Sequence, residues 1–231
     1  MNKDEVGQLI RRIAIIPAVK LSSTEDAHFA TETVASGGIP IVEITMTVPG
    51  AVELISHLTQ HHKKTLVGAG TVLDVDTARR CVDAGASFLT APELYLPVVE
   101  FAAKQGIVVI PGALTPTEVA AAWRSGADFI KVFPCAPVGG AKYIKALYTS
   151  LPQIPIIAAG GVNQQTAASF ILAGATAIGV GTDLIPFEAV KRRQTERIRE
   201  LAHRFAGFVA DARRQLEAAR AAEAGEPLGT P

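Results

Sequence analysis

The stretch Gly126-Ala127-Asp128-Phe129-Ile130-Lys131-Val132-Phe133-Pro134 joins the end of one predicted helix to a short apolar strand. Its glycine suits a helix stop, because the residue after a helix often adopts a left-handed backbone conformation. A similar order, with glycine and alanine followed after one residue by Phe or Ala, recurs at 85–88 and 174–177. A helix stop that leads directly into a strand, repeated along the chain, predicts a succession of βα units.

Eight short apolar runs recur along the chain, with helix-like segments between them. Each run is apolar almost throughout rather than alternating, as is typical of parallel strands that are buried on both faces. The segment Thr115-Pro116-Thr117-Glu118 carries the N-cap, first-turn proline and capping-box acid of a helix start. We therefore expect an α/β fold, a (β/α)8 TIM barrel, with an open doubly wound sheet as the alternative. The runs are Ile13–Val19, Ile39–Thr45, Leu66–Ala69, Phe88–Thr90, Ile107–Ile110, Phe129–Val132, Ile154–Ala158 and Ala177–Val180.

The pattern divides the chain into three parts. Residues 1–186 hold the expected barrel core with its N-terminal helix, and residues 187–217 are expected to form an amphipathic helix packed on the barrel. Residues 218–231 are expected to be a frayed or disordered tail. The C-terminal helix has an arginine-rich face that could bind an anion or a membrane surface, but interleaved glutamates favour a solvated face. Its apolar face consists of Ile198, Leu201, Phe205, Phe208, Ala212 and Leu216.

Composition argues against several classes of partner. Lys and Arg total 22, as do Asp and Glu, so the net charge of zero creates no global attraction to nucleic acid or to an anionic membrane. The N-terminal residues do not resemble a signal peptide, and no stretch reaches the roughly 18 apolar residues that span a bilayer. Cys81 and Cys135 could pair, but such sparse cysteine usage favours a reducing compartment. We expect a cytoplasmic protein without a nucleic acid or membrane partner.

Lys131 is the leading candidate for chemistry, because a lysine within an apolar strand is costly to bury as a cation. An apolar site favours the neutral amine, which is a nucleophile, whereas snorkelling to the barrel rim or ion pairing is the alternative. Glu43 interrupts another apolar run, either as an ion-pair partner or as a general acid–base. Reactive groups in such barrels lie at the C-terminal ends of strands, where Thr45, Thr47 and Thr71 also fall.

Two glycine-rich turns follow the seventh and eighth apolar runs. One contains Gly160 and Gly161, and the other contains Gly181 and Thr182. Barrels often bind phosphate at these two positions through backbone N–H groups. Tight turns with no ligand are the alternative interpretation.

A metal centre would need carboxylates or histidines that converge on one ion. The strand ends offer Glu43 but no clear second ligand. The five histidines fall on or beside predicted helices and are interpreted as surface residues, so no metal is expected. They are His28, His57, His61, His62 and His203.

At these residues the sequence resembles the 2-keto-3-deoxy-6-phosphogluconate (KDPG) / 4-hydroxy-2-oxoglutarate aldolase family. The motifs run in family order from about Ile13 to Pro186, and their combination is specific although each piece alone is common. The resemblance implies a class I lyase on a (β/α)8 barrel, usually a homotrimer, that works without metal or organic cofactor. The matching stretches are Val42-Glu43-Ile44-Thr45-Met46-Thr47-Val48-Pro49, Gly68-Ala69-Gly70-Thr71-Val72, Ile110-Pro111-Gly112, Lys131-Val132-Phe133-Pro134 and Ala159-Gly160-Gly161-Val162.

The resemblance also implies roles for individual residues. Lys131 matches the Schiff-base lysine, and Glu43 matches the general acid–base that works through a water molecule. Thr71 matches the threonine beside the pyruvate moiety, and Phe133 matches the aromatic residue that packs near the imine. The other residues expected to bind substrate are Pro92 and, at the distal phosphate, Gly160, Gly161, Gly181 and Thr182.

The expected contacts to the substrate carboxylate depart from the family pattern. Some members use an arginine in the second strand, where this chain has Thr47. Others carry an arginine at the end of the first strand, where this chain has Lys20. We therefore expect Lys20 and Thr47 to contact the carboxylate, and a lysine offers a point charge rather than the two-pronged grip of arginine.

The expected reaction is cleavage of a 2-keto-4-hydroxy acid. The first candidate is KDPG, which gives pyruvate and glyceraldehyde 3-phosphate, and the second is 4-hydroxy-2-oxoglutarate, which gives pyruvate and glyoxylate. The galactonate epimer and an unphosphorylated 2-keto-3-deoxy acid are alternatives. Rivals of other kinds are a metal-dependent aldolase, a phosphate-binding barrel isomerase or decarboxylase, and a non-catalytic scaffold.

Overall fold

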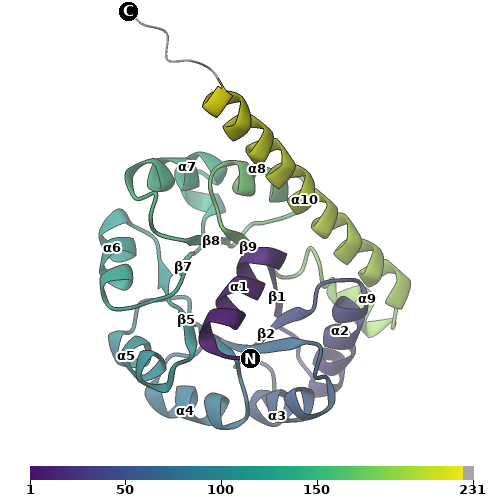
Figure 1. Ribbon diagram of the computed structural model, residues 1–231. Coiled ribbons are helices and arrows are strands. Elements are labelled where there is room, and N and C mark those ends of the chain that lie inside the picture. The colour runs from purple at the N-terminus through teal and green to yellow at the C-terminus, as the bar shows by residue number, and fades with distance from the viewer. Residues whose placement is uncertain (226–231) are drawn as a thin grey trace, which may run out of the picture.

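The computed structural model describes residues 1–225, and its strands form a parallel barrel (Figure 1). Neighbouring strands follow the order β5-β4-β3-β2-β1-β9-β8-β7-β6, and each paired neighbour runs parallel. Within this part of the chain the strands are β1 (Ile15–Val19), β2 (Ile41–Thr45), β3 (Leu66–Gly70), β4 (Phe88–Thr90), β5 (Val108–Ile110), β6 (Gly112–Ala113), β7 (Ile130–Val132), β8 (Ile156–Ala159) and β9 (Ala177–Val180).

The barrel closes where β5 and β6 meet, because only Pro111 separates them. β5 pairs with β4 and β6 pairs with β7, while the N–H of Asp128 donates to the carbonyl of Val109 at 3.0 Å. Pro111 has no N–H to donate to a neighbouring strand, so the strand is interrupted there. β5 and β6 are therefore two segments of one strand of the barrel. The eight resulting positions confirm the predicted (β/α)8 barrel.

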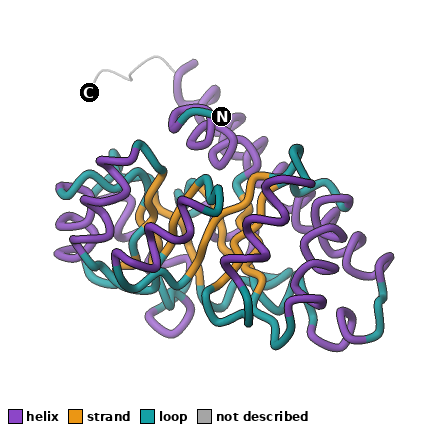
Figure 2. Tube along the Cα trace, turned by 90° about the horizontal axis from the view of Figure 1, so that it is seen from below, coloured by secondary structure: helices purple, strands orange, loops and turns teal. Residues whose placement is uncertain are grey.

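Helices surround the strands on the outside of the barrel (Figure 2). All residues of β2 and β3 are buried, as expected for strands covered on both faces. The helix start at Thr115 has the predicted capping box, in which the hydroxyl accepts from the N–H of Glu118. The helices of the barrel are α1 (Lys3–Ile13), α2 (Thr24–Ser36), α3 (Ala51–His61), α4 (Val75–Asp83), α5 (Leu96–Gln105), α6 (Pro116–Arg124), α7 (Ala141–Ser150) and α8 (Ala167–Leu172).

α1 lies across the N-terminal end of the barrel (Figure 1). Its buried residues Val6 and Ile10 face the core, and Ala14, in a left-handed conformation, leads directly into β1. Lys3 pairs with Asp128 at 3.0 Å, which fixes the start of the helix to the loop before β7. The N-terminal helix therefore covers the end of the barrel opposite the strand ends where chemistry is expected.

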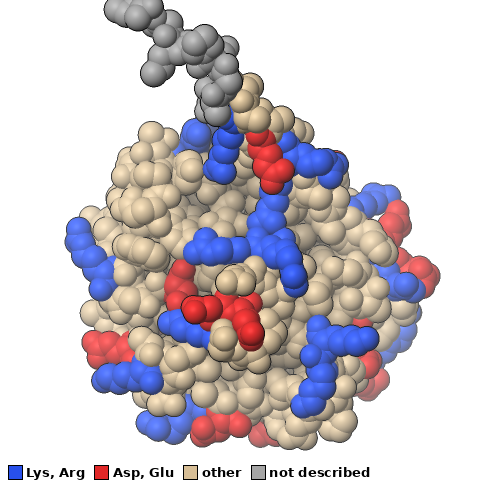
Figure 3. All heavy atoms as spheres, in the orientation of Figure 1, with Lys and Arg blue, Asp and Glu red and all other residues tan. Residues whose placement is uncertain are grey.

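Acidic and basic side chains lie side by side on the face that α1 crosses (Figure 3). Asp4 and Glu5 occupy the first turn of α1, and Arg11 and Arg12 occupy the last, an arrangement that complements the helix dipole. Among the helices of residues 1–225, none combines the length and apolar character required to cross a lipid bilayer.

The C-terminal part is two helices rather than the single helix expected over 187–217. α9 (Phe187–Lys191) ends before Arg193, whose φ of 51° is left-handed, and α10 (Thr195–Gly225) follows. The guanidinium of Arg193 pairs with Glu25 and Asp26 of α2 at 2.6 and 2.5 Å, which ties this break to the barrel. α10 then packs along α8 and α2 (Figure 1).

α10 is longer than expected. The expectation of a frayed tail from residue 218 is wrong for residues 218–225, which are helical because this segment is rich in alanine, the best helix former. Residues 226–231 of the expected tail lie outside the described residues. The buried face of α10 consists of Ile198, Ala202, Phe205, Val209 and Ala212.

Acidic partners offset much of the arginine-rich face of α10. Ion pairs along the helix join Arg199 to Glu196 at 3.1 Å and Arg204 to Glu200 at 2.5 Å. Arg213 is turned inward and donates to the carbonyl of Arg12 at 2.7 Å, at the end of α1. These contacts support a solvated helix packed on the barrel.

Candidate active site

A cavity of about 320 Å³ opens at the C-terminal ends of the barrel strands. Its volume falls within the range of small-molecule sites, and its walls come from residues of seven strands and from residues that follow the strands, among them Thr71 after β3. Ten of the predicted site residues line it together. They are Lys20, Glu43, Thr71, Pro92, Lys131, Phe133, Gly160, Gly161, Gly181 and Thr182.

Lys131 of β7 and Glu43 of β2 meet inside this cavity. Lys131 Nζ lies 3.7 Å from Glu43 Oε1, and the two side chains are 14% and 5% exposed. The separation exceeds that of a direct hydrogen bond, so the amine and the carboxylate are close without being locked together. Lys131 Nζ also lies 5.6 Å from the centre of the Phe133 ring. An amine and a carboxylate thus face one small space, an arrangement that suits nucleophilic attack with proton transfer.

Small neighbours make room for the Glu43 carboxylate. The strand register places Glu43 beside Ala18 of β1 and Gly68 of β3. A Cβ atom added at Gly70 would lie 2.1 Å from Glu43 Oε1, far inside van der Waals contact. Because Gly70 has no side chain, the Glu43 carboxylate can occupy this space.

We expect Gly70→Ala to lower kcat for aldol cleavage at least about tenfold, because the new methyl group must displace the Glu43 carboxylate from its place beside Lys131. The fold should persist, since the clash involves the end of a side chain. Steady-state kinetics with a thermal unfolding curve measure both effects. Gly207→Ala on α10, where a Cβ meets nothing within 4 Å, is the matched control and should keep full activity. Full activity in Gly70→Ala would contradict this role for Gly70.

Thr71 and Thr90 bring two hydroxyl-bearing residues to the cavity wall. Thr71 has a φ of 60°, a left-handed conformation that is strained for a β-branched residue and often marks a functional site. Thr90 is buried, and its hydroxyl has no hydrogen-bond partner within residues 1–225. Sequence reasoning missed Thr90 because it ends an apolar run, although a hydroxyl at a strand end was a usable signal.

The structure separates the two expected carboxylate contacts. Lys20 follows β1, is exposed and lines the cavity. Thr47 is exposed and absent from the cavity wall, and its hydroxyl lies 2.7 Å from that of Thr45. Thr45 lines the cavity and donates to the carbonyl of Val19 at 3.1 Å. Of these two threonines, Thr45 lines the cavity and Thr47 does not, because the chain turns away after β2.

The glycine-rich turns after β8 and β9 form one end of the cavity. Gly160 and Gly161 have positive φ values of 81° and 91°, and a Cβ at Gly161 would lie 2.2 Å from that of Ala136. The tight-turn interpretation is therefore sufficient to explain both glycines. After β9, the N–H groups of Leu184 and Ile185 donate to the Gly181 carbonyl at 3.0 and 2.9 Å, which makes one helical turn at the cavity.

Both cysteines are free and buried, so the structure describes no disulfide within residues 1–225. Burial raises the pKa of each thiol to about 11, and Cys135 Sγ donates to the Gly160 carbonyl at 3.4 Å beside the cavity. A raised pKa keeps the thiol protonated at neutral pH, and only the thiolate is reactive.

We expect iodoacetamide at pH 8 to leave both cysteines of the folded protein unmodified and its activity unchanged, since about one thiol in a thousand is ionised at that pH. Mass spectrometry before and after unfolding in urea measures the labelling. Rapid modification of Cys81 or Cys135 in the folded state would show that burial does not suppress their ionisation.

Comparison with known proteins identifies the family of the chain. The sequence model of the KDPG and KHG aldolase family matches residues 6–201. The chain belongs to this family. It is 30% identical over 205 residues to the 2-dehydro-3-deoxy-phosphogluconate aldolase of Pseudomonas aeruginosa. The aligned region covers 87% of this chain and 93% of the relative. It is 31% identical over 175 residues to the 2-dehydro-3-deoxy-6-phosphogalactonate aldolase of Escherichia coli, with 75% and 85% covered.

A solved structure of the family has the same fold. The chain is similar to the KDPG aldolase of Legionella pneumophila, with a TM-score of 0.79, 29% identity, and coverage of 85% of this chain and 96% of that one. That crystal structure holds pyruvate captured at low pH as a covalent carbinolamine intermediate. The predicted family is confirmed, and its members are aldolases, which are lyases.

Proposed function

We propose that this protein is a class I aldolase that cleaves KDPG to pyruvate and glyceraldehyde 3-phosphate through a Schiff base on Lys131. The observation that carries the proposal is the buried approach of Lys131 Nζ to Glu43 Oε1 at 3.7 Å in the strand-end cavity. The amine supplies an electron sink through imine formation, and the carboxylate moves protons. Pyruvate held as a carbinolamine in the Legionella relative supports this chemistry.

In the proposed reaction the Lys131 amine attacks the C2 ketone and forms a carbinolamine, which loses water to give a protonated imine. Glu43, through a water molecule, takes the proton of the C4 hydroxyl. The C3–C4 bond then breaks, its electrons pass to the imine as an enamine, and the aldehyde leaves. Proton return to C3 and hydrolysis of the imine release pyruvate and the free lysine.

The other cavity residues are proposed to position the substrate. Thr71 lies beside the pyruvate moiety, Phe133 packs near the imine, and Pro92 contacts the substrate. Lys20 pairs with the carboxylate, because it supplies the charge that this chain offers in place of arginine.

The far end of the cavity is proposed to hold the phosphate. The N–H groups of the turns at Gly161 and Thr182 suit an anion, and turns at these two barrel positions often bind phosphate. Asp183 also lines the cavity, and its negative charge would repel a phosphate. The affinity for phosphate therefore depends on whether attraction by the backbone N–H groups exceeds this repulsion.

We expect KDPG to be cleaved with a kcat/KM at least about tenfold above that of unphosphorylated 2-keto-3-deoxygluconate, since charge-assisted hydrogen bonds to phosphate each contribute about 1.5–3 kcal/mol. The assay couples pyruvate release to NADH oxidation, with EDTA present to exclude a metal-dependent aldolase. The galactonate epimer and 4-hydroxy-2-oxoglutarate are measured in parallel. Equal rates with and without phosphate would contradict the phosphate site, and a faster galactonate epimer would change the named substrate.

We further propose that the protein works as a homotrimer in the cytoplasm. The family resemblance supports the trimer, and the two free, buried cysteines suit a reducing compartment. Light scattering of the eluted protein should then give a mass about three times the 24.2 kDa of one chain.

A further inference from the structure

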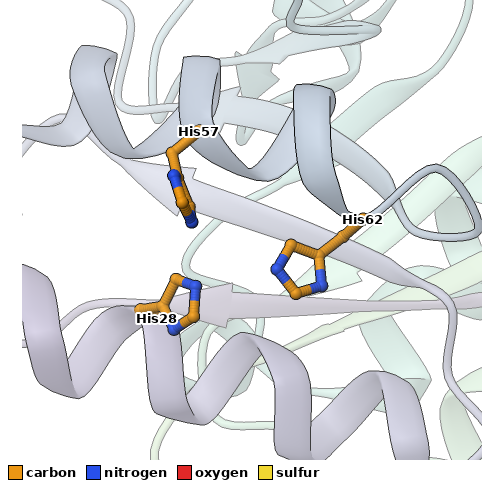
Figure 4. Close-up of side chains that lie close together, drawn as sticks. All are labelled: His28, His57 and His62. Carbon is orange, nitrogen blue, oxygen red and sulfur yellow. The ribbon is translucent and has the colours of Figure 1, made fainter.

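Three histidines that were predicted to be surface residues converge outside the barrel, away from the cavity. His28 lies on α2, His57 lies on α3, and His62 follows the end of α3. Figure 4 shows their rings around one common space, with a nitrogen of each ring turned toward it. One ring nitrogen from each residue lies within 4.8 Å of those of the other two.

The ring of His28 offers an unpartnered nitrogen to that space. His28 Nε2 is buried and has no hydrogen-bond partner in residues 1–225, which is costly for a polar atom. Neutral imidazole is the form that binds a metal ion.

Glu32 braces the cluster from one side. Its Oε2 lies 3.4 Å from His28 Nδ1, and its Oε1 lies 3.6 Å from His62 Nε2. A carboxylate on the ring nitrogen that does not bind the metal is the usual support of a metal-bound histidine, and Glu32 has this position at Nδ1 of His28. His28 is thereby held with its unpartnered Nε2 free for a ligand.

His61 lies beside this cluster and packs against it, but it is not one of the three residues whose ring nitrogens converge. Its ring stacks on that of His57 at 4.4 Å between centroids, and its Nδ1 lies 2.8 Å from the carbonyl of His57. The stacking restricts the rotation of His57, which is otherwise exposed.

We propose that His28, His57 and His62 bind a divalent zinc-type ion, and that Glu32 orients the ring of His28 for this binding. Imidazole nitrogens select zinc and its transition-metal neighbours, whereas calcium and magnesium require oxygen ligands. Zinc–nitrogen bonds of about 2.0–2.1 Å place the nitrogens of tetrahedral ligands about 3.4 Å apart. The ring nitrogens here lie within 4.8 Å of one another, so each pair must approach by about 1.4 Å at most to bind the ion. Side-chain rotations of surface residues on two packed helices supply such a movement.

The ion would join α2 to α3, the helices before and after β2. Its role is stabilisation of this part of the barrel wall, because none of the three histidines lines the catalytic cavity. The site is independent of the proposed function, and either can fail without the other.

The test is a zinc titration of chelator-treated full-length protein against a chromophoric competitor. We expect one zinc per chain, and a Tm raised by about 5–10 °C at free zinc a hundredfold above Kd. His57→Gln and His62→Gln should each weaken binding at least a hundredfold, and Glu32→Gln about tenfold. His203→Gln, on the exposed face of α10, is the matched control and should bind zinc like the wild type.

Metal-free unfolding curves separate loss of the ligand from loss of the fold in each variant. The Glu43→Gln variant should bind zinc normally, and the wild-type kcat should be the same with and without zinc, which keeps this site apart from the catalytic one. Cobalt in place of zinc should give the visible spectrum of a tetrahedral site in the wild type and lose it in His57→Gln. Wild-type zinc affinity in both His57→Gln and His62→Gln, or no zinc bound by the wild type, would overturn the proposal.

Discussion

Replacing Lys131 with arginine is expected to lower kcat/KM for KDPG cleavage by about ten-thousand-fold or more. Without a primary amine no imine forms, and the loss corresponds to about 5.5 kcal/mol of transition-state stabilisation. Arginine is preferred to alanine because alanine would leave the buried Glu43 carboxylate without its neighbouring side chain, and loss of one partner from a buried pair costs about 3–5 kcal/mol of stability. The measurement is the steady-state rate of pyruvate release by the purified variant.

Two controls make this result specific to Lys131. Lys145→Arg changes an exposed lysine of α7, whose ammonium lies over the Tyr148 ring, and should keep the wild-type rate. A thermal unfolding curve for Lys131→Arg should remain cooperative. If Lys131→Arg kept more than a tenth of the wild-type kcat/KM in a folded protein, Lys131 would not be the nucleophile.

Replacing Glu43 with glutamine is expected to lower kcat by about a hundredfold to ten-thousand-fold, with little change in KM. The amide has nearly the shape of the carboxylate but cannot accept or return a proton. Imine formation with pyruvate should continue, whereas exchange of the pyruvate methyl protons with deuterium, which requires proton transfer at C3, should slow with kcat. Nuclear magnetic resonance measures the exchange and steady-state kinetics measure the turnover.

The matched control is Glu53→Gln, which changes an exposed carboxylate of α3 and should leave both rates unchanged. A Glu43→Gln enzyme that turned over at the wild-type rate would assign the proton transfer to another group. A variant that lost imine formation as well as turnover would indicate that Glu43 acts mainly by holding Lys131.

The barrel could be predicted from sequence because its strands are buried on both faces and therefore appear as apolar runs. The boundaries were less accurate where apolar residues serve other elements. Ile13 ends α1, and Ile39 lies in the loop before β2, although both belong to predicted strands. The short β6 was missed because Pro111 interrupts the ladder with no change in the apolar pattern.

Individual site residues were harder to place than the strands that carry them. Lys131 and Glu43 were visible because a charged residue stands out in an apolar run, and the structure brings them together. Thr47 was placed at the substrate because it follows β2, but which side a residue faces after a strand ends depends on the turn. The strained backbone of Thr71 was likewise visible only in three dimensions.

The histidine cluster illustrates a limit of sequence patterns. His57 and His62 share the end of α3, but His28 reaches them only through the packing of α2 against α3. No fixed sequence spacing encodes that contact, because it depends on how two helices pack on the barrel. The break between α9 and α10 at Arg193 could not be predicted for the same reason, because its ion-pair partners Glu25 and Asp26 are distant in sequence.

The most direct test of the Schiff-base mechanism is to trap the imine with pyruvate and sodium borohydride and to map the modified peptide by mass spectrometry. We predict one reduced three-carbon adduct per chain, located on Lys131, with activity lost in proportion to modification. Lys131→Arg should take up no adduct under the same conditions. A wild-type enzyme that stayed active with Lys131 unmodified, or that carried the adduct on Lys20, would contradict the proposed mechanism.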